Sequence, residues 1–438
     1  MNRKEHLGYK KYLMNLLPNM CANMTAPLVK IVEIAVLGSF FSPVYIAGLG
    51  VAVILLNTFE WLLSWLRASI VLESGQAFQK GDKKLQAKVL GQHLATVIII
   101  WSIIILLKEP IWNFVMRLYQ PRLEVCIQGK IFWDTAVWAM PLNWVNYMIM
   151  GWLFGRGRIK NAVLLEIGAN MLNIILCLLY QDHIKMNDIA EIFFVTQLII
   201  LIIGIGVILK EDKQVLRHMW RLSVWYPKGT QKRIKRHRDI VKRTVCTVIM
   251  MNIVIATSCR FGTVVLAANF IMMQLKDIIS YLFGGIGTTI RGLTARSNID
   301  HNILRLQDIH RMTLEIVMYT SIGIVMFYLV QRTQLINNIT KLKLIKQSIL
   351  TYDGWLIIYP ILASWGLSTN GLYLGLEESR FIGISMYTAL IIFLISYAIF
   401  VPLIGNHGLW LSVIVFYLVR SIMLLGYEGY LYDEARQN

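Results

Sequence analysis

Residues 190–209 read AEIFFVTQLI ILIIGIGVIL. The stretch has one acidic residue, near its start, and is otherwise almost entirely apolar. A helix of 20 residues is about 30 Å long, which matches the hydrocarbon thickness of a bilayer. The stretch therefore predicts a membrane-spanning helix, and the remaining chain can be searched for others.

Eleven further stretches are long enough, or nearly so, to span a membrane. The chain of 438 residues is 56% hydrophobic and only 16% charged, too few polar residues to cover a soluble core of this size. The sequence therefore predicts an all-α integral membrane protein with twelve transmembrane helices. The expected spans are 12–37, 44–72, 89–107, 130–154, 162–180, 190–209, 244–260, 264–290, 312–330, 348–375, 381–402 and 409–426.

A basic segment, residues 210–243, separates the first six expected spans from the last six. It holds 12 basic and 3 acidic residues, so it carries half of the net charge of +18. In a soluble protein such a charge would indicate nucleic-acid binding. Between membrane spans it reports topology first and attraction to anionic lipid second. We therefore expect membrane lipids as partners and no nucleic acid.

The distribution of Lys and Arg predicts the orientation of the spans. With both termini in the cytoplasm, the inside segments hold 29 of these residues and the outside segments hold 9. This bias is the one that the positive-inside rule predicts. The first apolar stretch has no small-residue cleavage site and is interpreted as a retained helix. We expect a multi-pass protein of a bacterial inner membrane with cytoplasmic termini.

The two halves of the chain share a pattern of proline and glycine near the end of the fourth span. The matching residues are Pro141, Gly151 and Gly155 in the first half and Pro360, Gly371 and Gly375 in the second. An internal repeat with a polar connector is typical of transporters. We therefore expect two six-helix lobes related by an internal repeat, 1–209 and 244–438, joined by the cytoplasmic connector 210–243.

No enzyme signature accompanies this pattern. The sequence has no Walker loop, GxSxG or HExxH motif, and its five cysteines lack metal-ligand spacing. We expect no catalytic residue, no metal and no cofactor. Without an ATP site, transport would have to be driven by a proton or sodium gradient.

Several motifs, taken in order, resemble one transporter family. They are Pro27-Leu28 with Val32-Glu33-Ile34-Ala35-Val36-Leu37-Gly38, then Ser42-Pro43-Val44-Tyr45-Ile46-Ala47-Gly48-Leu49-Gly50, Gln76-Ala77 with Gly81-Asp82, Gly151-Trp152-Leu153-Phe154-Gly155 and Leu266-Ala267-Ala268-Asn269. The chain resembles the multidrug and toxin extrusion (MATE) family, as a divergent member of its DNA-damage-inducible (DinF-type) branch. The resemblance implies a secondary antiporter that exports small organic, often cationic, compounds by alternating access.

The resemblance also implies that an acidic residue of the first helix couples transport to the ion gradient, and Glu33 holds that place. Three positions depart from the family pattern. Lys30 replaces a glycine, Cys177 stands where the second acid of the amino-terminal lobe is expected, and Arg291 stands where the branch carries Glu. These departures put the coupling ion in question, and they leave the predicted fold unchanged.

Glu33 and Lys30 can also be interpreted from physical chemistry alone. An ionised group in the membrane is costly, so such residues usually face the bundle interior and often function in transport. Because Lys30 and Glu33 are three apart on one helix face, a permanent ion pair is the alternative. In a third interpretation, the Lys30 ammonium replaces the coupling cation, and the substrate is zwitterionic or anionic.

Five amide residues are candidates for lining the substrate cavity: Asn57, Asn170, Asn173, Asn269 and Gln274. Buried packing and hydrogen bonds between helices would explain them equally well. Two other functions stay open at this point, a flippase for a lipid-linked precursor and a transport-inactive membrane scaffold. We expect a small-molecule substrate and a monomer.

Overall fold

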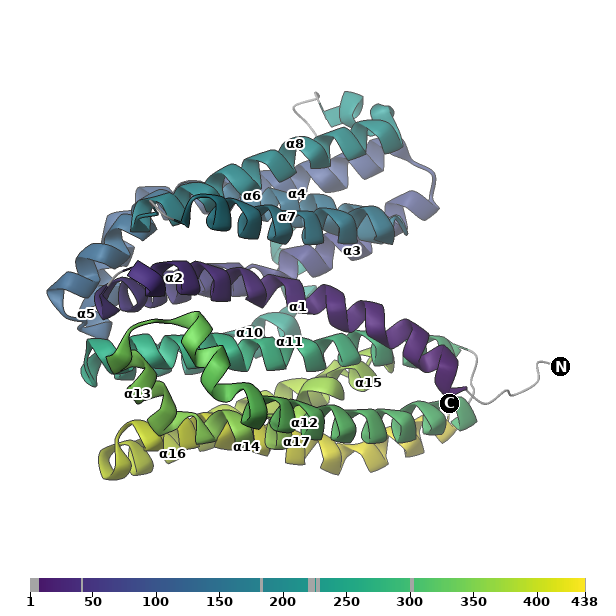
Figure 1. The fold of residues 1–438 in the computed structure, drawn as a ribbon. Coiled ribbons are helices and arrows are strands. Elements are labelled where there is room, and N and C mark those ends of the chain that lie inside the picture. Colours follow the sequence, from purple (N-terminus) through teal and green to yellow (C-terminus); the bar gives the residue numbers. More distant parts are fainter. Residues whose placement is uncertain are drawn as a thin grey trace. The chain divides into compact units, whose positions relative to one another are not determined.

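The computed structural model describes residues 8–40, 42–181, 184–219, 225, 229–299 and 303–437. The elements in these residues are helices throughout (Figure 1). Ten of the described helical segments are long and apolar enough to cross a membrane. Helices suit that environment because each backbone N–H and C=O finds its partner within the same segment.

The described residues form two compact units. Unit 1 comprises residues 1–31 and 268–438, and unit 2 comprises residues 32–267. The division passes through two helices, α1 (Tyr9–Phe40) and α11 (Thr263–Ile299). The lobes 1–209 and 244–438 stay a prediction, because packing units and sequence repeats divide a chain by different criteria.

Unit 2 begins within α1 and contains the helices from α2 to α10. Within it, α4, α6, α7 and α8 run side by side (Figure 1). The bounds are α2 (Pro43–Leu62), α3 (Ser64–Gln79), α4 (Lys83–Leu106), α5 (Lys108–Tyr119), α6 (Leu123–Gly155), α7 (Ile159–Leu179), α8 (Met186–Met219), α9 (Thr230–Arg236) and α10 (Arg238–Arg260).

The expected connector thus includes the end of α8, all of α9 and the start of α10. Residues 220–224 and 226–228 of this segment lie outside the described residues.

Unit 1 contains most of α11 and the helices that follow. Here α16 and α17 pack against each other along their lengths, and α14 packs against α17 and α12. The bounds are α12 (Ile303–Ile339), α13 (Lys343–Tyr352), α14 (Gly354–Ser368), α15 (Asn370–Gly375), α16 (Ser379–Ile404) and α17 (Asn406–Gln437).

Each of the twelve expected spans falls on described helices. Two of them are not among the ten apolar segments. The span 130–154 lies in α6, whose buried face includes Asn143 and Asn146. The span 348–375 covers the end of α13, all of α14 and all of α15. Polar residues and helix breaks lower the local hydropathy, so these two spans are harder to recognise from composition.

The proline and glycine pattern has the same packing role in both halves. A Cβ on Gly155 of α6 would collide with Val71 O and Ser74 Oγ of α3. A Cβ on Gly375 of α15 would lie 2.9 Å from Arg291 O and 2.7 Å from Thr294 Cβ of α11. In each half, glycines therefore allow the fourth expected span to approach the second at backbone distance.

Candidate functional site

Glu33 lies in the second half of α1, and its side chain is completely buried. Pro27, six residues earlier in the same helix, is also buried, and it cannot donate a hydrogen bond to the carbonyl of Asn23. Lys30 is half-buried. The boundary between the units falls between these two charged residues, after Ile31. The ion pair between Lys30 and Glu33 stays a prediction.

The amide candidates of unit 2 lie on α2 and α7. Asn57 and Asn170 are half-buried, and Asn173 is buried. The Cys177 thiol donates to Asn173 Oδ1 over 3.5 Å, one turn further along α7. The position where a second acid was expected is thus a buried thiol, a weak donor that carries no charge in this arrangement.

The two amide candidates of unit 1 are both buried on α11. Asn269 Nδ2 donates to Asn406 Oδ1 over 2.7 Å, and Asn406 Nδ2 donates back to Asn269 Oδ1 over 3.0 Å. Trp410 Nε1 donates to the same Asn269 oxygen over 2.9 Å. These bonds tie α11 to α17. Gln274 is 4% exposed, and the cavity role of both amides stays a prediction.

A charged and aromatic cluster follows on the same helix. Lys276 Nζ lies 2.6 Å from Asp277 Oδ1, and the lysine is 1% exposed. The ammonium also lies 3.4 Å from the Tyr417 hydroxyl and over the rings of Tyr359 and Tyr417, 5.7 and 5.5 Å from their centroids. Ion pairing and two cation–π contacts thus hold one buried ammonium among α11, α14 and α17.

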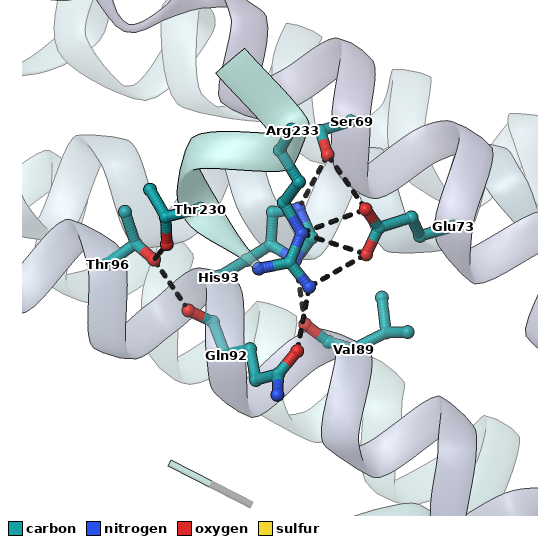
Figure 2. A network of polar contacts seen from close by, with 8 residues as sticks. All are labelled: Ser69, Glu73, Val89, Gln92, His93, Thr96, Thr230 and Arg233. Atoms are coloured by element: carbon teal, nitrogen blue, oxygen red, sulfur yellow. Dashed lines mark hydrogen bonds and ion pairs between the residues drawn. The ribbon is translucent and has the colours of Figure 1, made fainter. Parts of the chain in front are cut away.

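A second network fixes α9, which lies in the expected connector, to α3 and α4 of the same unit (Figure 2). Arg233 of α9 points inward and donates to both carboxylate oxygens of Glu73 on α3, with Nε and Nη2 each within 3.0 Å of an oxygen. Its Nη2 also donates to Gln92 Oε1 of α4 over 2.7 Å. A bidentate guanidinium–carboxylate pair of this kind is among the stronger polar contacts in proteins.

His93 completes this network from α4, where it is completely buried. Its Nδ1 lies 2.8 Å from Val89 O, and its Nε2 lies 3.2 Å from Ser69 Oγ. The first contact requires a proton on Nδ1. Ser69 Oγ donates to Glu73 Oε1 over 3.3 Å, so the same hydroxyl links His93 to the carboxylate that Arg233 binds.

A third charged network surrounds Asp212, at the point where α8 leaves helical geometry. Asp212 pairs with Lys83 of α4 and, over 3.0 Å, with Arg156 at the end of α6. The Arg156 guanidinium also lies over the Trp152 ring, 4.2 Å from its centroid, and over the Phe78 ring. The network joins α4, α6 and α8 at the ends nearest the connector.

The charged residues of unit 2 have contacts within one helix and contacts between helices. Lys130 lies 2.6 Å from Asp134, one turn further along α6. Arg67 of α3 lies 3.0 Å from Glu166 of α7, and Glu60 of α2 accepts a hydrogen bond from Asn143 of α6.

One further carboxyl group is buried at the start of α14. Asp353 lies 3.1 Å from Arg332 of α12. Among the described residues, no group of three or more His, Cys, Asp or Glu side chains is arranged to hold a metal ion.

The chain is similar to known proteins in sequence and in structure. The MatE family model matches residues 18–179. DNA damage-inducible protein F of Escherichia coli (strain K12) is 25% identical over 417 residues, which cover 93% of this chain and 89% of that protein.

Two solved structures extend the similarity over the whole fold. The inward-facing conformation of a multidrug resistance MATE family transporter of the MOP superfamily has a TM-score of 0.83 at 15% identity, with 96% of this chain and 99% of that chain covered. A MOP superfamily transporter from Pyrococcus furiosus, described by the reverse polarity of its binding pocket, has a TM-score of 0.76 at 16% identity, with 98% and 97% covered. These similarities confirm the predicted fold of twelve transmembrane helices in two six-helix lobes.

Proposed function

Because this chain belongs to the MATE family of multi-pass membrane transporters, we propose that it is a secondary active antiporter. It exports small organic compounds, cationic ones among them, from a bacterial cytoplasm across the inner membrane. A proton or sodium gradient drives the exchange, with no further cofactor. The protein acts as a monomer, with its termini and its basic connector in the cytoplasm.

The observation that carries this proposal is the complete burial of Glu33 within the α1 span. A carboxylate at membrane depth is costly, so its presence there points to a role in transport. The free energy of ionising a carboxylate changes as its surroundings alternate between dry and hydrated. Glu33 can therefore exchange a proton or a cation as α1 changes its environment, and Pro27 allows that helix to bend.

Lys30 determines which form of this mechanism applies. If its ammonium pairs with Glu33 throughout the cycle, Glu33 stays ionised and carries no proton. If the pair opens, Lys30 takes the place of the coupling cation. The added positive charge then favours a zwitterionic or anionic substrate. The Pyrococcus furiosus transporter, which is described by the reverse polarity of its binding pocket, supports this second substrate class.

Dye efflux from cells that lack their own pumps tests the proposal. Under an imposed pH or sodium gradient, we expect the wild-type chain to expel a cationic dye and Glu33→Gln to abolish gradient-driven efflux. Glu124→Gln is the matched control, because it makes the same change at an exposed position on α6. Wild-type efflux by both Glu33→Gln and Lys30→Ala would show that neither residue couples transport.

A further inference from the structure

One face of α11 is polar and only partly covered. Asp277, Tyr281 and Thr288 recur at spacings that place them on one side of a helix, and Arg291 follows one turn later. Asp277 is half-buried and the other three side chains are exposed. These four residues are called the α11 polar face.

Other spanning helices expose a different kind of surface. The exposed side chains of α12 include Met318, Ile322 and Met326, each more than half exposed. On α16, Ile391 and Ile395 are also more than half exposed. Apolar surfaces of this kind suit contact with hydrocarbon, whereas exposed carboxylate and guanidinium groups do not. The α11 polar face therefore meets water or a solute.

Asp277 is the negative charge of this face, and its two oxygens have different surroundings. Oδ1 contacts the buried ammonium of Lys276, while the side chain as a whole is 21% exposed. The Lys276 side chain is 2% exposed, so Asp277 is the more accessible partner of the pair. A solute that approaches this face meets the negative charge first.

We propose that Asp277 binds the cationic group of a small organic solute. The proposal rests on the proposed transport function and adds a recognition residue in unit 1. Tyr281, one turn further on the same face, provides an aromatic surface for the solute. A carboxylate beside an aromatic ring is a suitable site for an organic ammonium group.

Lys276 provides the counter-charge of Asp277. Among the described residues, Asp277 is the one carboxylate that contacts this ammonium; its other neighbours are the Tyr359 ring and the ring and hydroxyl of Tyr417. A substitution that neutralises Asp277 alone would leave a buried ammonium without a counter-charge, which is strongly unfavourable.

Equilibrium binding to the purified full-length chain tests the site without any ion gradient. The probes are ethidium, an organic cation, and fluorescein, an organic anion, both followed by fluorescence anisotropy. We expect Asp277→Asn to weaken ethidium binding by about tenfold or more, the loss typical of a charge-assisted contact, with fluorescein binding not weakened. Asp134→Asn is the matched control, since it neutralises a lysine-paired carboxylate on α6 and leaves binding of both dyes unchanged.

The double variant Lys276→Met/Asp277→Asn removes both charges and so avoids a stranded ammonium. It is expected to fold and to bind ethidium as weakly as Asp277→Asn. Wild-type affinity in either folded variant, or a wild-type chain that binds no ethidium, would refute the recognition site. If the site binds ethidium but the wild-type chain shows no gradient-driven efflux, the proposed antiport fails and the binding site stands.

Discussion

At the scale of single residues, the buried charges of this protein fall into two kinds. Arg233 and Glu73 are paired bidentately between α9 and α3, in an arrangement that fixes structure. Glu33 is buried in a transmembrane helix where charge is costly, and the coupling role is our proposal for it. The role of a buried charge therefore depends on the groups around it. Substitution of the charged residue distinguishes a structural role from a role in transport.

For Arg233, removal of one partner is expected to destabilise the fold. Glu73→Gln leaves a buried guanidinium and Arg233→Met leaves a buried carboxylate, so each lowers the free energy of unfolding by about 3 kcal/mol. The double variant recovers most of this loss, because neither charge is then left alone. Unfolding in mixed micelles measures the effect.

Lys235→Met, on an exposed residue of the same short helix, serves as the control and leaves stability unchanged. If Arg233→Met unfolds like the control, α9 is not held by this pair.

At the scale of elements, glycine determines how closely the helices pack. A side chain at Gly371 of α15 would collide with the carbonyl of Gly287 on α11, and Gly155 has the same relation to α3. The second and fourth expected spans therefore pack closely in each half of the chain. The internal repeat visible in the sequence therefore corresponds to a repeated packing contact.

Gly371→Ala is accordingly expected to lower the free energy of unfolding by about 1–3 kcal/mol, the usual result of overpacking. Gly323→Ala on α12 is the control, because a Cβ there meets nothing within 4 Å. Because alanine has a higher helix propensity than glycine, Gly323→Ala leaves the free energy of unfolding unchanged or raises it by up to about 1 kcal/mol. Thermal unfolding of the two purified variants gives the comparison, and equal stability would contradict the close-packing role.

At the scale of the whole molecule, the basic residues predict which side of the membrane each connection faces. The connector holds 12 of the 29 basic residues assigned to the inside, whereas Lys343 of α13 belongs to a segment assigned to the outside. Positive connections are retained in the cytoplasm during insertion. This topology is part of the proposed function, because export requires a defined direction.

Cysteine labelling tests the topology in a chain whose five native cysteines have been replaced. A membrane-impermeant maleimide is expected to label Lys343→Cys in intact spheroplasts and Lys235→Cys only after lysis; both positions are exposed. Labelling of position 235 in intact spheroplasts would place the connector outside and reverse the proposed direction.

The sequence by itself determined the class of fold and the twelve helical spans. These properties are local, because twenty apolar residues form a spanning helix whatever their neighbours are. It also singled out Glu33, the acidic residue of the first span.

Only the tertiary structure decided which distant charges meet. Arg233 is one of 12 basic residues in its segment, and no sequence signal distinguishes it from the exposed Lys235. Its partner Glu73 is 160 positions away, and Lys276 meets Tyr359 and Tyr417 from two other helices. Hydrophobic pattern places each helix in the membrane, but the partners of a buried charge depend on how the helices pack against one another.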